Sequence, residues 1–149
     1  MALSDQSQNP LLGKWETQHE IAPFNVIYDE HFQPALEIAC SEALLEVEEI
    51  IKNRNEPTFE NTIEALLSTG QLLDRIVSTF YTIAGAHTNK KRDELLLVFS
   101  SKLSDHNTNI YSNTELFDRI DRVVKTKHLN DLDQEQDRVL KLIHRNFVR

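Results

Sequence analysis

Residues that break helices are scarce in this chain, and this scarcity limits the range of folds that it can adopt more than any other feature. Only three Gly and four Pro occur among 149 residues, fewer than in an average protein. No run of alternating polar and apolar residues stands out, and no Asn-Gly hairpin signal occurs. We therefore expect an all-α fold built from long helices.

The composition excludes several classes of protein. Hydrophobic residues make up 40% of the chain and charged residues 27%, which is typical of a globular domain with a buried core. The net charge of −8 argues against nucleic acid or an anionic membrane as a partner. No apolar run approaches the ~20 residues of a membrane span, and residues 1–9 lack a signal-peptide core. The single Cys40 fits a reducing compartment, so we expect a cytoplasmic protein.

The first 27 residues are expected to form an extended arm that lays apolar side chains on a helical body. Pro10 and Pro23 rule out a continuous helix there. A disordered tail is the alternative, but Trp15 and Phe24 argue against it for residues 10–27. Residues 1–8 are expected to be disordered. Residues 28–149 would then form a helical subdomain.

From about His31 onward, apolar residues recur at intervals of three and four, which predicts about five helices in an antiparallel bundle. The first helix should begin just before Pro34 and end near residues 53–55. The second should start at the N-cap Thr58 and reach about residue 86 if it is unbroken. Gly70 lies on its apolar seam, which fits either the close approach of another helix or a kink.

Polar residues mark the starts of the last three helices. The alternatives for each N-cap are Thr88 or Asn89, Asn113 or Thr114, and Asp131 or Asp133. No Gly or Pro follows the last helix, so the chain is expected to be cut rather than finished. The positions predicted to be buried are Leu36, Cys40, Ala43, Val47, Ile50, Ile63, Leu66, Leu73, Val77, Phe80, Ala84, Leu96, Phe99, Leu103, His106, Ile110, Leu116, Phe117, Ile120, Val123, Val124, Leu140, Ile143 and Phe147.

The sequence contains no zinc-peptidase motif. Such a motif places two His four residues apart on a helix, with a Glu beside the first. The one His-Glu pair is His19-Glu20, and Pro23 stands where the second His would be. Glu16 and His19 have the Glu-x-x-His spacing of di-iron bundles, but in a single copy and in a non-helical arm. We therefore predict no metal-binding residue here.

Single histidines and the cysteine offer no catalytic group either. His106 lies on an apolar seam and is expected to be a core residue that hydrogen-bonds a neighbouring helix, with a ligand or catalytic role as the alternative. Cys40 is expected to act as a small buried hydrophobe, because no base that could activate it is indicated. Of the other histidines, two are expected at helix ends (His31 and His87) and two fit no pattern (His128 and His144). No catalytic or cofactor-binding residue is predicted.

Several short motifs, in this order and spacing, resemble the N-terminal region of the zinc peptidases of the thimet oligopeptidase type (family M3). The resemblance is closest to the bacterial peptidyl-dipeptidases and oligopeptidase A, and it covers roughly residues 9–149. The motifs are Asn9-Pro10-Leu11-Leu12, Pro23-Phe24, His31-Phe32-x-Pro34-Ala35, Pro57-Thr58-Phe59-Glu60-Asn61-Thr62-Ile63, Ala86-His87-Thr88-Asn89 and Asn109-Ile110-Tyr111-Ser112-Asn113-x-x-Leu116-Phe117-x-Arg119-Ile120.

This resemblance implies a fragment of a large helical enzyme with a deep channel. In that family the zinc and its His-Glu-x-x-His helix lie far toward the C-terminus, and N-terminal helices wall the channel and restrict substrates to short peptides. None of the family's catalytic or zinc-binding positions falls within residues 1–149. The chain would thus be a non-catalytic subdomain of a zinc-dependent oligopeptidase or peptidyl-dipeptidase, with zinc only in the full-length parent.

The resemblance also implies partners. They would be the remainder of the peptidase and, in the parent, short peptides, with self-association of the fragment where apolar faces are left uncovered. The alternative is a free-standing helical interaction module without enzymatic activity. A separate small enzyme is the third reading, and no group of residues supports it.

Overall fold

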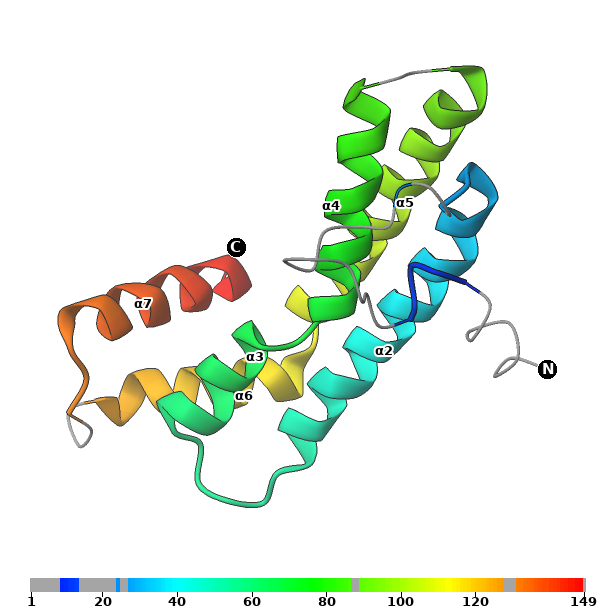
Figure 1. Cartoon of the computed structure of the whole chain (residues 1–149). Helices are drawn as coiled ribbons and strands as arrows, with labels where there is room; N and C mark the ends of the chain where they lie inside the picture. Colours follow the sequence, from blue (N-terminus) through cyan, green and yellow to red (C-terminus); the bar gives the residue numbers. More distant parts are fainter. Residues whose placement is uncertain (1–8, 14–23, 25–26, 87–88, 128–130, 149) are drawn as a thin grey trace. The chain divides into compact units, whose positions relative to one another are not determined.

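The computed structural model describes residues 9–13, 24, 27–86, 89–127 and 131–148. Within these ranges the chain is all-α and forms no strand (Figure 1). None of the described helices is long and apolar enough to cross a bilayer. The long helices are α2 (Phe32–Lys52), α4 (Gln71–Ala86), α5 (Lys90–Tyr111), α6 (Thr114–Lys125) and α7 (Gln134–Val148). The prediction of an all-α fold with about five helices is confirmed.

Four helical segments begin where the sequence places an N-cap. The side chains of Thr58, Asn89, Asn113 and Asp133 each accept a hydrogen bond from the backbone N–H three residues further on. These bonds satisfy N–H groups that have no partner inside the helix. Thr88, the other candidate for the third start, lies outside the described residues. The caps could be predicted because each depends on residues only three positions apart.

The second predicted helix is not continuous. It consists of a π-helical turn, η3 (Phe59–Glu64), a single α-turn, α3 (Ala65–Leu67), and then α4. Between α3 and α4 the chain turns through Gly70, whose φ is +73°. A Cβ added at Gly70 would lie 3.8 Å from the Cβ of Ala43, an ordinary contact. The glycine is therefore required by the backbone of the break and not by the close approach of another helix.

We expect Gly70→Ala to lower the free energy of unfolding by about 1–2 kcal/mol, because an L side chain is strained at positive φ. Gly85→Ala is the matched control, since Gly85 lies within α4 and an added Cβ there meets nothing within 4 Å. That control should be neutral or stabilising by up to about 1 kcal/mol. Urea unfolding followed by circular dichroism measures both, and equal effects would contradict the assignment.

The chain divides into two compact units. Unit 1 comprises residues 1–43 and 70–104, and unit 2 comprises residues 44–69 and 105–149. Each unit is thus built from two stretches of sequence, and α2 and α5 contribute residues to both.

The core of unit 1 is centred on three phenylalanines from three helices. Phe80 of α4 stacks on Phe99 of α5, with ring centroids 4.1 Å apart. Phe32 of α2 meets the ring of Phe80 edge-on at 5.1 Å. Leu11 and Ile27, from the first 27 residues, also join this core. Trp15, Pro23 and residues 1–8 lie outside the described residues.

The core of unit 2 is formed by the second part of α2, by η3 and by α6 and α7. Its fully or nearly fully buried side chains are Val47, Ile50, Phe59, Ile63, Leu116, Ile120, Val123 and Leu140. Seven of these eight positions were predicted from the sequence to be buried, and Phe59 was missed. The helical periodicity therefore locates most of this core.

Candidate functional site

The motif at residues 57–63 forms a self-contained hydrogen-bonded cap. The backbone N–H of Thr58 donates to Asn61 Oδ1 at 2.7 Å, and the N–H of Asn61 donates to Thr58 Oγ1 at 3.0 Å. This reciprocal pair is a capping box in which Asn replaces the usual Glu or Gln. Asn61 Nδ2 also donates to the carbonyl of Glu56 at 3.0 Å, and Thr62 Oγ1 donates to Asn61 Oδ1 at 2.8 Å. The polar side chains of this motif therefore hold the backbone.

Arg119, from the motif at residues 109–120, joins this cap to the end of α2. Its Nη1 donates to the carbonyl of Asn53 at 2.8 Å, and its Nη2 lies 3.3 Å from Asn61 Oδ1 and 3.4 Å from Thr62 Oγ1. Burial lowers the pKa of Arg119, and the charge of Glu56 opposes that shift. The two longest motifs therefore meet in one clamp, which we call the Arg119 clamp.

The motif at residues 9–12 has a similar structural role in unit 1. Asn9 Nδ2 donates to the carbonyl of His31 at 2.9 Å, while Asn9 Oδ1 accepts the N–H of Leu11 at 3.0 Å. The guanidinium of Arg75 donates to the carbonyls of Leu11 and Gly13. Residues 9–12 also close a turn through the Leu12 N–H and the Asn9 carbonyl. This part of the predicted arm is therefore a turn rather than an extended segment.

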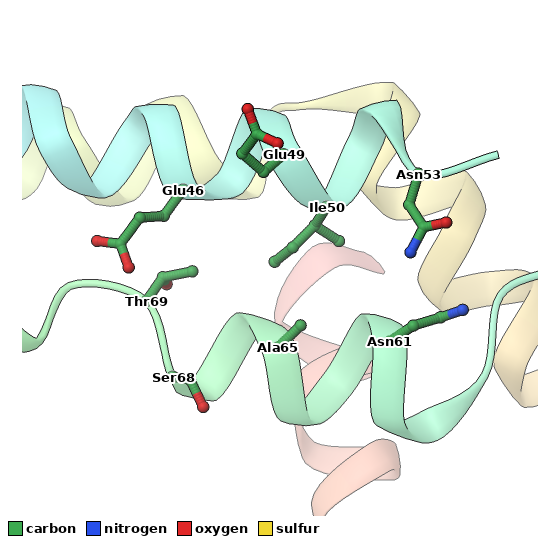
Figure 2. Close-up of a pocket in the computed structure, with 8 residues that line it drawn as sticks. All are labelled: Glu46, Glu49, Ile50, Asn53, Asn61, Ala65, Ser68 and Thr69. Atoms are coloured by element: carbon green, nitrogen blue, oxygen red, sulfur yellow. The ribbon is translucent and has the colours of Figure 1, made fainter. Parts of the chain in front are cut away.

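A groove of about 470 Å³ lies in unit 2 beside the Arg119 clamp. One wall is the second part of α2, and the other is formed by η3, α3 and the turn at residues 68–70 (Figure 2). Ile50 and Ala65 face each other across it, and Glu46 reaches toward Thr69. Glu49 stands on α2 at the rim, with its carboxylate directed away from the opposite wall. The lining residues are Glu46, Glu49, Ile50, Asn53, Asn61, Ala65, Ser68 and Thr69.

Most polar groups of the groove are already engaged within its own walls. Ser68 Oγ donates to the carbonyl of Glu64 at 3.0 Å, and Thr69 Oγ1 donates to that of Leu66 at 2.7 Å. Asn61 is held in the capping box described above. The groove contains no His or Cys, so it lacks a nucleophile paired with a base. Its composition suits binding rather than covalent chemistry.

A second hollow, of about 350 Å³, lies in unit 1. Its lining combines acidic side chains with Lys91, and one of the lining residues, Asp29, pairs with Arg92 at 3.0 Å. Its charges are therefore partly balanced. Among the residues that the structure describes, no three His, Cys, Asp or Glu side chains are grouped closely enough to hold a metal ion.

His106 is buried as predicted, with 7% of its surface exposed. The expected hydrogen bond to a neighbouring helix is not found at Nδ1, which has no partner among the described residues. Burial lowers the pKa of His106, which favours the neutral imidazole.

Cys40 is partly buried and packs against the core of unit 1. Burial raises the pKa of its thiol, with a smaller opposite effect from Lys102. The protonated thiol is a weak nucleophile. The remaining histidine and glutamate candidates, Glu16, His19, Glu20, His87 and His128, lie outside the described residues.

Sequence reasoning missed a titratable cluster between α6 and α7. His144 Nε2 lies 3.1 Å from Asp121 Oδ1, and Lys125 Nζ lies 2.7 Å from Asp121 Oδ2. The ring of His144 also stacks on Phe117, with centroids 5.7 Å apart. Hydrogen bonds from Lys125 and His144 lower the pKa of Asp121. No sequence pattern could reveal this pair, because 23 residues separate its members.

This cluster gives a pH-dependent contribution to stability. Because the pKa of Asp121 is lowered in the folded state, its contribution is present above the unfolded pKa of about 3.9 and is lost as the pH falls through the folded value. Asp121→Asn should therefore lower the free energy of unfolding by about 0.5–1 kcal/mol at neutral pH. The difference between the two proteins should decrease toward zero in acid. Urea unfolding between neutral and acidic pH tests this, with Asp118→Asn on the same helix as the control. A cost that persists undiminished in acid would contradict it.

Comparison with known proteins identifies relatives of the chain, although no family model matches it. The dipeptidyl carboxypeptidase of Salmonella typhimurium is 36% identical over 142 residues. The dipeptidyl carboxypeptidase of Escherichia coli is 34% identical over 142 residues. Both matches cover 95% of this chain and 21% of the relative. The chain thus spans about a fifth of the length of these relatives.

Proposed function

We propose that this chain, a relative of the bacterial dipeptidyl carboxypeptidases over nearly its whole length, is the N-terminal helical subdomain of a zinc-dependent peptidase of that kind. The observation that carries the proposal is the asymmetry of the matches, which cover 95% of the chain but 21% of each relative. The sequence also lacks a His-Glu-x-x-His motif. The zinc site and the hydrolytic step would then lie in the part of the peptidase beyond this segment.

In this proposal the chain has a structural role and no catalytic one. Its helices wall a channel that admits short peptides, which the rest of the cytoplasmic peptidase hydrolyses. The roles of the motif residues support this reading. The side chains of Asn9, Thr58, Asn61 and Arg119 bond to backbone or to one another within their own unit. Residues placed in this way stabilise a scaffold, and none of them is paired for acid–base or nucleophilic catalysis.

A free-standing interaction module is the second candidate. Several large apolar side chains are exposed, among them Leu45 at 61%, Leu67 at 60% and Leu97 at 74%. Exposed apolar surface favours association with a partner. Under the first proposal that partner is the remainder of the peptidase. Under the second it is a separate protein or another copy of this chain.

A segment exchange tests the proposal. In the dipeptidyl carboxypeptidase of Escherichia coli, the matching segment is replaced by this chain, and release of dipeptides from a short peptide is measured. We expect the exchanged enzyme to retain activity, the enzyme without the segment to lose it, and the isolated chain to be inactive with added zinc. Peptide cleavage by the pure isolated chain would overturn the proposal. An exchanged enzyme that folds and holds zinc but cleaves nothing would also count against it.

A further inference from the structure

We propose that His31 makes the junction between the turn at residues 9–12 and the start of α2 sensitive to acid. Its imidazole must be neutral to hold the backbone that precedes the helix, and protonation of the ring would release that backbone. All of the residues involved belong to unit 1, and their behaviour does not depend on the proposed function.

The imidazole of His31 accepts a hydrogen bond from the backbone just before the helix. His31 is the last residue of a short 3-10 turn, η2 (Asp29–His31), which leads directly into α2. The backbone N–H of Tyr28 donates to His31 Nδ1 at 2.9 Å, and the N–H of His31 donates to the carbonyl of Tyr28 at 3.0 Å. The two rings also lie close, with centroids 5.6 Å apart. The side chain of His31 thus takes the place that Glu or Gln usually has in a capping box.

Only a neutral ring can make this bond. Nδ1 must keep its lone pair to accept the N–H of Tyr28, so the ring proton lies on Nε2. In a protonated imidazole both ring nitrogens are donors, and neither can accept. Protonation would also place a positive charge in the first turn of the helical segment, where the helix dipole disfavours a cation. Acid therefore removes the hydrogen bond and adds an unfavourable charge.

No carboxylate is paired with the ring of His31 among the described residues, so a proton there has no direct counter-ion. Asp29, two residues earlier, is already paired with Arg92 of α5 at 3.0 Å. Glu30 is exposed, so water and salt screen its attraction for a protonated ring. The charged groups that surround this junction are Asp29, Glu30 and Glu37 from its own helical segment, Arg75 from α4, and Lys91 and Arg92 from α5.

The carbonyl of His31 connects the capping box to the turn at residues 9–12. Asn9 Nδ2 donates to this carbonyl at 2.9 Å, and Asn9 Oδ1 accepts the N–H of Leu11 at 3.0 Å. The side chain of Leu11 is 0% exposed and belongs to the core of unit 1. His31 thus binds the backbone before the helix through its ring and the turn through its carbonyl. Loss of the first bond frees the backbone of residues 28–31 and should weaken the second.

The direction of the pH dependence follows from the neutral ring. Imidazole side chains titrate near pH 6.5 in general. Because the folded junction uses the neutral form, the stabilisation from the bond is present well above this pH and is lost as the pH falls through it. We therefore expect the junction to be closed at pH 7.5 and loosened at pH 5.

NMR spectroscopy of the ring nitrogens tests the tautomer directly in the 149-residue chain. At pH 7.5 His31 should carry its proton on Nε2, with Nδ1 unprotonated. A ring with its proton on Nδ1 could not accept the N–H of Tyr28, and this result would overturn the inference.

Exchange of the Tyr28 amide with solvent, also measured by NMR, tests the response to acid. Each rate is divided by the rate in His31→Gln at the same pH, which removes the intrinsic effect of pH on exchange. Gln at this position keeps an acceptor and does not titrate. The ratio should rise about fivefold between pH 7.5 and pH 5, the usual effect of losing a helix cap, and the ratio for the Leu11 amide should rise as well. A ratio for Tyr28 that stays constant would overturn the inference.

His144→Gln is the matched control. It removes a titrating ring from unit 2 and makes the same change of side chain. The rise in Tyr28 exchange between pH 7.5 and pH 5 should be the same in this variant as in the unmodified chain. Loss of the rise in His144→Gln would mean a general effect of acid on the fold, and would overturn the assignment to His31.

Discussion

Phe80→Ala is expected to lower the free energy of unfolding by about 3–5 kcal/mol, the usual cost of removing a fully buried Phe. Phe80 is 0% exposed and contacts both other rings of the unit 1 core. The substitution would remove the stacked pair with Phe99 and the edge contact with Phe32. Each such aromatic contact adds about 0.5–1.5 kcal/mol to the stabilisation from buried apolar area. Urea unfolding of both proteins by circular dichroism gives the difference.

Leu97→Ala is the control for Phe80→Ala. Leu97 belongs to the same unit but is 74% exposed, so its truncation should change stability by less than about 0.5 kcal/mol. A cost of Phe80→Ala below about 1.5 kcal/mol would mean that the three-ring core is not what holds unit 1 together.

Arg119→Met should lower the free energy of unfolding of unit 2 by about 2–3 kcal/mol, because it removes charged hydrogen bonds and leaves the carbonyl of Asn53 without its Arg119 donor. The affected acceptors are the carbonyl of Asn53 and the side-chain oxygens of Asn61 and Thr62. Met keeps much of the apolar volume of the side chain, so the loss reports mainly on hydrogen bonding. Unfolding followed by circular dichroism measures the change.

Arg122→Met, one turn further along α6, is the matched control. Arg122 pairs with Glu56 at 2.6 Å, but both side chains are more than 60% exposed. Exposed pairs contribute about 0–1 kcal/mol, so this variant should be nearly neutral. A similar loss of unfolding free energy in the two variants would contradict the special role of Arg119 in the clamp.

The local features of this fold could be predicted from sequence. The caps at Thr58, Asn113 and Asp133 each depend on a side chain and an N–H three residues apart, and the apolar seams depend only on helical spacing. The resemblance to peptidyl-dipeptidases was also confirmed, since the relatives are dipeptidyl carboxypeptidases that match 95% of the chain at 34–36% identity.

The features that sequence could not predict depend on contacts between distant segments. A glycine on an apolar seam fits both a break and a close approach, and only the φ of +73° at Gly70 decides for the break. The Arg119 clamp joins residues 57 to 66 positions apart, and the pair of His144 with Asp121 joins two helices. His106 was expected to find a hydrogen-bond partner because buried polar groups usually have one, and its Nδ1 has none among the described residues.

The most direct test of the central claim, that this chain is a non-catalytic part of a larger peptidase, is the intact mass of the native gene product in its source cell. The account predicts a mass several times the 17.3 kDa of these 149 residues, in a protein that carries zinc and releases dipeptides. A native product of about 17 kDa would contradict it, and would mean that the helical module works by binding a partner.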